Sequence, residues 1–131
     1  MIQERRKTMS WIFNGTEAVF IQIAAKLRCD ILGGKYSLEE QFPTVRQIAA
    51  EAAVNPNTVQ KALTVLEDEG LLYSKGTAGR FITSDTAVLS AAKRQIIADT
   101  AREIISKARS LGIDTEELIQ YIQQEESKNE C

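Results

Sequence analysis

The fold of this chain is decided by residues 42–71, which read FPTVRQIAAEAAVNPNTVQKALTVLEDEGL. Apolar residues recur there at intervals of three and four, which is the period of an amphipathic helix. Val54-Asn55-Pro56 interrupts the pattern, because proline fits the first position of a helix but not its interior. We therefore predict two short helices, the first capped by Thr44 and the second capped by Asn55.

The two predicted helices, residues 44–53 and 57–69, have the proportions of a helix-turn-helix. Such a unit needs small or apolar side chains where its helices cross. Ala49 is small at the expected crossing, and Gly70 ends the second helix. The other positions that support the crossing are Ile48, Val54, Val59 and Ala62.

The sequence around this stretch completes a unit of three helices and a hairpin. Residues 16–32 show helical spacing, with Thr16 as the expected N-cap and Gly33-Gly34 as the stop. Two short strands, residues 71–75 and 80–83, follow the second helix of residues 42–71 and are joined by the glycine-bearing loop 76–79. The predicted fold is mainly α, a winged helix-turn-helix with a β-hairpin wing.

A helical tail is expected after Ser84. Apolar residues from Leu89 to Leu111 predict one long helix that Gly112 closes, and a last helix starts at Asp114. The polar residues from Gln123 onward are expected to fray. We place a winged domain at residues 9–84 and a two-helix dimerisation tail at residues 85–131.

Composition disfavours several classes of function. The 131 residues include no histidine, and the two cysteines lack the spacing of a zinc or redox site, so we expect no metal, no cofactor and no enzymatic activity. No apolar run approaches the roughly 18 residues of a membrane span, and the charged N-terminus does not resemble a secretory signal. We expect a cytoplasmic protein without a membrane partner.

Charge is unevenly distributed. Residues 1–84 contain 10 Lys and Arg against 9 Asp and Glu, a net +1, whereas residues 85–131 contain 6 against 9, a net −3. The overall net charge of −2 therefore reflects the tail. A positive DNA-binding face would have to come from local clustering of Lys and Arg.

The second helix of the helix-turn-helix predicts contacts with DNA bases. Its outward residues Asn57, Thr58, Gln60, Lys61 and Thr64 are of the types that read base edges in the major groove. Thr44 and Arg46 lie at the N-terminus of the preceding helix, where they can bind a phosphate. Residues of the wing are further candidates for contacts with DNA. The alternative is a helical hairpin whose polar residues only face water. The wing residues are Lys75, Gly76, Thr77 and Arg80.

The runs 42–49, 54–62 and 66–71 closely resemble the winged helix-turn-helix of GntR-type regulators, over residues 16–83. Residues 11–13 with Phe20, Gln22 and Ile23 resemble the YtrA-like subfamily, whose members have a short two-helix tail. The resemblance implies that Arg46, Thr58 and the wing contact DNA and that the tail dimerises. Ala53 departs from the family's glycine, and a left-handed backbone there would cost about 1 kcal/mol.

Further departures concern the loop before the helix-turn-helix and the wing. Leu38-Glu39-Glu40 stands where the family has Pro-Gly, and the wing glycines are spaced differently from the family's. Thr44 replaces the usual serine and keeps a hydroxyl. The predicted DNA-binding residues are Thr44, Arg46, Asn55, Asn57, Thr58, Gln60, Lys61, Lys75 and Gly76.

The tail carries a narrow apolar seam with alternating spacings of four and three, which is typical of a helix that pairs with another helix. The alternative is that the last helix folds back over the seam within one chain. We expect a homodimeric repressor that binds an inverted-repeat operator, with any effector unspecified. The family resemblance implies that it controls a nearby operon of the transporter type. A protein-docking module without sequence-specific DNA binding is the alternative function. The seam residues are Ile97, Ala101, Ile104, Ala108 and Leu111.

Overall fold

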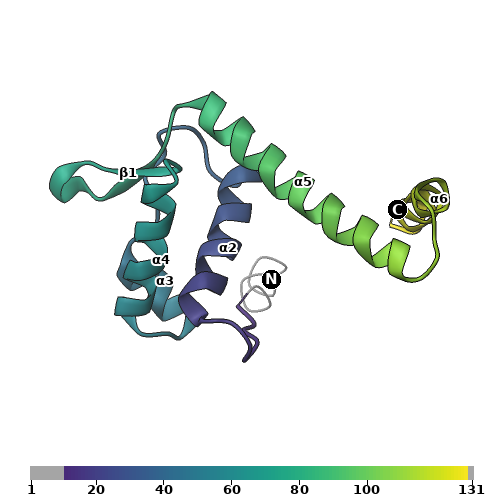
Figure 1. Ribbon diagram of the computed structural model, residues 1–131. Helices are drawn as coiled ribbons and strands as arrows, with labels where there is room; N and C mark the ends of the chain where they lie inside the picture. Colours follow the sequence, from purple (N-terminus) through teal and green to yellow (C-terminus); the bar gives the residue numbers. More distant parts are fainter. Residues whose placement is uncertain (1–10, 130–131) are drawn as a thin grey trace. The chain divides into compact units, whose positions relative to one another are not determined.

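The computed structural model describes residues 11–129 and divides into two units, with the boundary between Leu89 and Ser90. The predicted domain limits at residues 9 and 131 lie outside the described residues. The first unit contains helices α2 (Val19–Leu32), α3 (Val45–Ala52) and α4 (Pro56–Asp68). Strands β1 (Leu72–Ser74) and β2 (Arg80–Ile82) follow, joined by the short 3-10 helix η1 (Gly76–Ala78) (Figure 1). The predicted three helices and antiparallel hairpin are confirmed.

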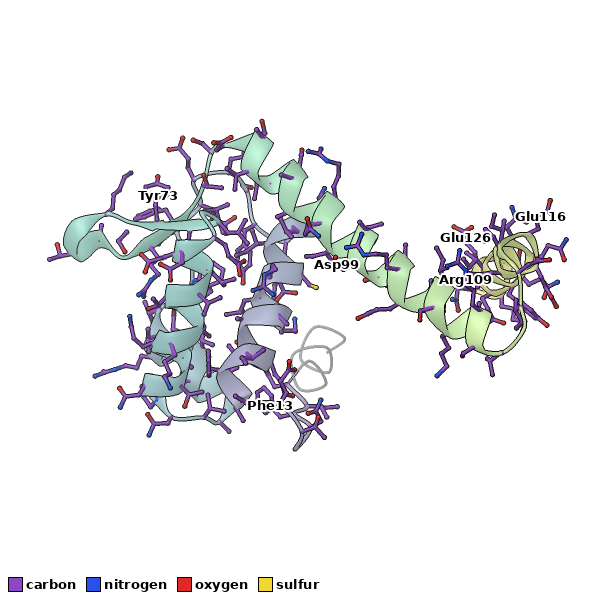
Figure 2. The ribbon with its side chains drawn as sticks, in the orientation of Figure 1. Phe13, Tyr73, Asp99, Arg109, Glu116 and Glu126 are labelled. Atoms are coloured by element: carbon purple, nitrogen blue, oxygen red, sulfur yellow. The ribbon has the colours of Figure 1, made fainter. Side chains whose placement is uncertain are left out.

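Helix α4 lies at the centre of the first unit and contacts α2, α3 and β1. The side chains on its buried face are completely inaccessible to solvent, and side chains fill the space between α2 and α4 (Figure 2). Ala62 is one of them, and its methyl group lets the neighbouring helices approach closely. The α4 residues that form this core are Val59, Ala62, Leu63 and Leu66.

Side chains from α2, α3 and both strands of the hairpin complete the core around α4. Burial of each large aliphatic group contributes about 1.5–3 kcal/mol, so this shared core holds the elements together. The contributing residues are Ile23, Leu27 and Ile31 of α2, Ile48, Ala49 and Ala52 of α3, and Leu71, Leu72 and Ile82 of the hairpin region.

The start of α2 differs from the prediction. The helix begins at Val19 and Ala18 precedes it without a side-chain cap, so the expected N-cap Thr16 is wrong. The Thr16 hydroxyl instead donates to Asn14 Oδ1 (2.8 Å), and the Thr16 amide donates to the same oxygen (3.0 Å). A local turn of this kind competes with helix formation for the same donors. The Gln22 amide group reaches back to the carbonyl oxygens of Asn14 and Glu17 and holds this turn against α2.

The loop before α3 pairs with the wing, which the sequence did not indicate. The amides of Glu39 and Phe42 donate to the carbonyl oxygens of Ile82 (3.0 Å) and Arg80 (2.8 Å), and the Ile82 amide donates to Glu40 (2.9 Å). Gln41 and Phe81 form an antiparallel bridge. The hairpin therefore has a third, irregular edge that ends just before the α3 N-cap.

The second unit contains α5 from Ser90 onward and all of α6. Helix α5 (Thr86–Ser110) is followed by a turn in which Gly112 has φ +76°, and α6 (Thr115–Lys128) begins with the predicted cap, Asp114. The expected fraying from Gln123 is wrong up to Lys128, because glutamine, glutamate and lysine are good helix formers. Within residues 11–129, every helix is too short or too polar to cross a membrane.

The turn between α3 and α4 contains backbone strain. Ala53 has φ 58° and ψ 47°, the left-handed conformation that the sequence pattern suggested would be costly here. The Val54 amide donates to the Ala49 carbonyl oxygen (3.1 Å), which holds the turn closed. A residue with a β-carbon is disfavoured in this conformation, whereas glycine adopts it readily.

We therefore expect Ala53→Gly to raise the free energy of unfolding by about 1 kcal/mol, because it relieves this strain. Ala50→Gly is the matched control, since Ala50 is exposed within α3 and glycine there should lower the free energy of unfolding by about 1 kcal/mol. Urea denaturation followed by circular dichroism measures both. Equal destabilisation by the two substitutions would contradict the assigned turn geometry.

Candidate nucleic-acid interface

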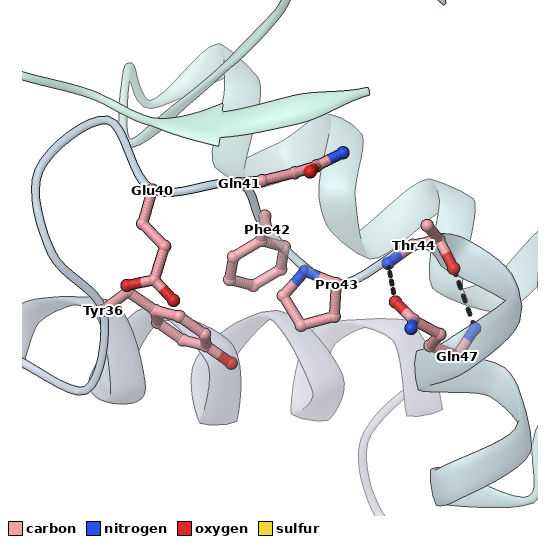
Figure 3. A pocket seen from close by; sticks show the side chains of 7 residues that line it. All are labelled: Tyr36, Glu40, Gln41, Phe42, Pro43, Thr44 and Gln47. Atoms are coloured by element: carbon pink, nitrogen blue, oxygen red, sulfur yellow. Dashed lines mark hydrogen bonds between the residues drawn. The ribbon is translucent and has the colours of Figure 1, made fainter. Parts of the chain in front are cut away.

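The N-terminus of α3 is built by a capping box. The Gln47 amide donates to Thr44 Oγ1 (3.1 Å), and the Thr44 amide donates to Gln47 Oε1 (2.8 Å) (Figure 3). Because Thr44 Oγ1 accepts this bond, its O–H remains able to donate to an anion. Arg46 is exposed in the first turn beside it. Amides at a helix N-terminus together with a hydroxyl and a guanidinium form a suitable phosphate-binding set.

Helix α4 presents its N-terminal polar residues to solvent. Asn55 caps the helix by accepting a hydrogen bond from the Asn57 amide (2.7 Å), and Pro56 occupies the first helical position, as predicted. Asn57 and Gln60 are exposed, and Thr58 is half-buried. The Thr64 hydroxyl donates to the Gln60 carbonyl oxygen (3.0 Å) and is therefore turned back onto the helix.

Lys61 extends from α4 toward the beginning of α2. Its ammonium group lies 5.0 Å from the centroid of the Phe20 ring, a distance at which a cation is attracted to an aromatic face. The residue remains exposed. This contact orients the Lys61 charge without neutralising it.

The wing separates its residues onto two faces. Leu72 and Ile82 are paired and buried, whereas Tyr73 and Phe81 are paired on the opposite face with their ring centroids 6.0 Å apart. Lys75 is exposed after β1, and its ammonium group lies 4.8 Å from the Phe81 ring centroid. Gly76 has φ +54° at the start of η1, so a residue with a β-carbon would be strained there.

Electrostatics distinguish three cations of the first unit from the others. Lys26 and Lys35 pair with Asp30, Arg28 pairs with Glu69, and Arg80 pairs with Glu67. Within residues 11–89, no described carboxylate pairs with the three remaining cations. These are Arg46 on α3, Lys61 on α4 and Lys75 at the wing.

A shallow hollow of about 350 Å³ lies beside the α3 N-terminus. Its lining includes Tyr36 and Phe42, whose ring centroids are 5.0 Å apart, and the capping pair Thr44 and Gln47 (Figure 3). Burial, together with nearby carboxylates, raises the pKa of Tyr36 to about 12, so its phenol stays protonated at neutral pH. No group of residues within 11–129 has the composition of a metal site.

The second unit exposes most of the predicted seam. Ile97 and Leu111 are each 67% exposed, and Ile104 is 43% exposed. Ala101 is also exposed, whereas Ala108 is buried at the end of α5, where its carbonyl oxygen accepts from the amides of the turn. Helix α6 therefore does not cover the seam within the chain, and its own Ile119 and Ile122 are exposed as well.

Comparison with known proteins identifies the family. Residues 21–82 match the family described as "Bacterial regulatory proteins, gntR family". A GntR-family transcriptional regulator from Bacteroides thetaiotaomicron is 30% identical, and the matched region covers 86% of this chain and all of that one, with a TM-score of 0.61. The chain belongs to the GntR family. It is therefore a DNA-binding transcription regulator and not an enzyme.

The GntR similarity extends beyond the winged helix. A GntR-family regulator from Listeria monocytogenes has a TM-score of 0.82 at 26% identity, over 86% of this chain and 98% of that one. The transcriptional repressor YtrA of Bacillus subtilis is 28% identical over 107 residues, covering 81% of this chain and 82% of YtrA. Matches of this length include the tail and support the YtrA-like assignment.

A further similar structure contains DNA. The DNA-binding domain of AraR, in complex with operator ORX1, is 26% identical with a TM-score of 0.50 over 55% of this chain and 93% of that domain. The contacts made by individual residues of the present chain remain a prediction.

We expect Arg46→Ala to weaken binding to every duplex alike, because an arginine at a helix N-terminus positions the protein on phosphates and carries no base preference. The slope of log affinity against log salt should fall by about 1 for the lost contact. Fluorescence anisotropy across a salt series measures both quantities. Lys26→Ala removes the same charge from a residue paired with Asp30, and should leave the slope unchanged. Equal slopes for wild type and Arg46→Ala would remove Arg46 from the interface.

Proposed function

We propose that this GntR-family chain is a transcriptional repressor that binds an inverted-repeat operator as a homodimer and controls a nearby operon of the transporter type. Residues 9–84 would bind the DNA in the cytoplasm, and residues 85–131 would dimerise. The DNA-binding set is Thr44, Arg46, Asn55, Asn57, Thr58, Gln60, Lys61, Lys75 and Gly76.

The observation that carries this proposal is the position of Arg46, Lys61 and Lys75, which have no carboxylate partner among residues 11–129. They lie on α3, on α4 and beside the wing, the three parts of a winged helix-turn-helix that meet a duplex. The other cations within residues 11–89 pair with nearby carboxylates, so the modest net charge of this unit is compatible with a positive face for phosphates.

Sequence selectivity would come from the exposed amide side chains of α4. Asn57 and Gln60 lie within its first two turns, and an Asn or Gln side chain can form two hydrogen bonds with an adenine edge in the major groove. Asn55 would act by capping the helix so that these turns are well formed. The half-buried Thr58 places a hydroxyl and a methyl group beside the same groove.

Repression is supported by the similarity to the repressor YtrA, and operator binding by the similarity to operator-bound AraR. A repressor of this kind would act by occupying promoter DNA that RNA polymerase needs. A salt titration separates this function from docking to a protein, since only binding to phosphates predicts a steep loss of duplex affinity with salt.

Dimerisation is supported by how little the second unit buries. Ala108 is the only buried residue among the described residues of this unit, and large aliphatic groups along α5 and α6 remain in water. Helices in proteins owe most of their stability to tertiary packing of an apolar face, and short helices without such packing are marginal in water. A second copy that covers Ile97, Ala101, Ile104 and Leu111 would supply that packing.

We expect Gln60→Ala to relax sequence preference more than it lowers affinity for non-specific DNA, because a lost base contact removes about 1–3 kcal/mol of discrimination. Selection of bound sites from a random duplex pool, with wild type in parallel, identifies the affected base pair. Lys61→Ala tests the neighbouring outward position in the same way. Unchanged selected sites for both variants would show that this face of α4 does not read bases.

We expect Ile104→Asp to convert a dimer into monomers, because it places a charge within the apolar seam. Analytical ultracentrifugation measures the oligomeric state, and binding to a palindrome compared with a half-site measures the effect on DNA. Ser106→Asp adds the same charge at an exposed polar position of α5 and should leave both unchanged. A monomeric wild-type protein at micromolar concentration, or full palindrome affinity for Ile104→Asp, would contradict this assignment.

A further inference from the structure

One carboxylate on α4 contacts both strands of the wing. Ser74 Oγ donates to Glu67 Oε2, and Arg80 Nε lies 3.3 Å from Glu67 Oε1. Ser74 and Arg80 are directly opposite each other in the hairpin register. Glu67 therefore ties β1 and β2 to the same point of the helix that carries the predicted base-reading residues.

The contact is well shielded from water. The Arg80 side chain is 18% exposed and the Glu67 side chain is 25% exposed. Arg80 Nε is fully buried and has no hydrogen bond of good geometry within the described residues. Since a buried charged donor without a partner is costly, the attraction of Glu67 is what offsets the burial of this guanidinium.

The hairpin register explains why Arg80 points toward α4. Side chains alternate between the faces of a strand, so Ser74 and Arg80 share the inward face with the buried pair Leu72 and Ile82. The predicted DNA contact Lys75 follows Ser74 and reaches the ring of Phe81, on the opposite face. The Arg80 side chain thus points toward α4 and pairs with Glu67, whereas the Lys75 side chain lies on the opposite face of the hairpin, beside Phe81.

The backbone of Arg80 links the wing to the phosphate-binding end of α3. Its carbonyl oxygen accepts from the Phe42 amide (2.8 Å), two residues before the N-cap Thr44. A nearby contact reinforces this link, because the Gln41 side-chain amide donates to the Ala78 carbonyl oxygen in η1 (2.8 Å). Movement of the wing would therefore also displace the backbone just before the α3 N-terminus.

We propose that Glu67 is a positioning residue for DNA recognition, which fixes the wing relative to α4 by holding Ser74 and Arg80. In this proposal Arg80 acts through the ion pair and does not contact a phosphate. The inference rests on the proposed function, because it requires the wing to contact the duplex. Holding the wing at a fixed position relative to α4 would let α4 and Lys75 contact the duplex at the same time.

The test compares Glu67→Gln and Arg80→Gln in the full-length protein. We expect each to lower operator affinity about threefold to tenfold, the range for a residue that acts on a binding site through its neighbours. The slope of log affinity against log salt should stay at the wild-type value. Hydroxyl-radical footprinting should show loss of protection where the wing lies, with protection by α4 retained. The double variant should lose no more affinity than either single variant, because both remove the same contact.

Two further variants make the result decisive. Arg80→Lys keeps a charge for Glu67 and should retain the wing footprint, while Lys75→Ala should lower the salt slope by about 1. A reduced slope for Arg80→Gln would overturn the proposal, because Arg80 would then contact a phosphate. Parallel loss of the α4 and wing footprints would also overturn it, since that pattern indicates general destabilisation. An unchanged footprint and slope for Lys75→Ala would instead refute the wing contact in the proposed function.

Discussion

The complete burial of one face of α4 is the constraint on which the rest of the first unit depends. Val59, Ala62, Leu63 and Leu66 have no solvent exposure, and α2, α3 and both strands of the hairpin contribute side chains to the same core. Once this face is buried, the helical period leaves Asn57, Gln60 and Lys61 pointing outward. The position of the predicted reading surface is therefore a consequence of packing.

Pairing of charges within the unit bears on how the proposed DNA-binding face could exist without a high net charge. Asp30, Glu67 and Glu69 each pair with one or more cations. The Glu69 pair joins α2 to the end of α4, and the Glu67 pair joins β2 to α4. Within residues 11–89, the cations outside these pairs are Arg46 on α3, Lys61 on α4 and Lys75 at the wing. This arrangement accounts for a DNA-binding domain whose composition is close to neutral, since a duplex responds to the local field and not to the sum of charges.

The features that could be predicted from sequence are those governed by local rules. Thr44, Asn55 and Pro56 mark helix starts through capping chemistry, and Gly70 follows the end of α4, so the helix-turn-helix could be recognised from neighbouring residues alone. Thr16 shows the limit of such rules, because its amide and its hydroxyl both donate to Asn14 Oδ1 and Thr16 does not cap α2.

The features that could not be predicted depend on residues far apart in the chain. Pairing of residues 39–42 with β2 brings together two segments separated by about forty residues, and the polar loop sequence has no alternating pattern to signal a strand. The contacts of Glu67 have no signal in the sequence, because a glutamate on a helix usually faces water. Its role depends on the register of a hairpin that places Ser74 and Arg80 opposite each other.

The second unit raises a different physical question, which is what keeps two helices folded when so little of them is buried. Its described residues bury only Ala108, and helix propensity alone makes a small contribution in water. If a second copy supplies the missing apolar contacts, folding of the tail and dimerisation become one equilibrium, so the stability of the tail depends on protein concentration. Binding to an inverted repeat would bring two copies together on one duplex and thereby favour the same equilibrium. Operator binding would then favour folding of the tail, and folding of the tail would raise the affinity for the operator, because both require two chains.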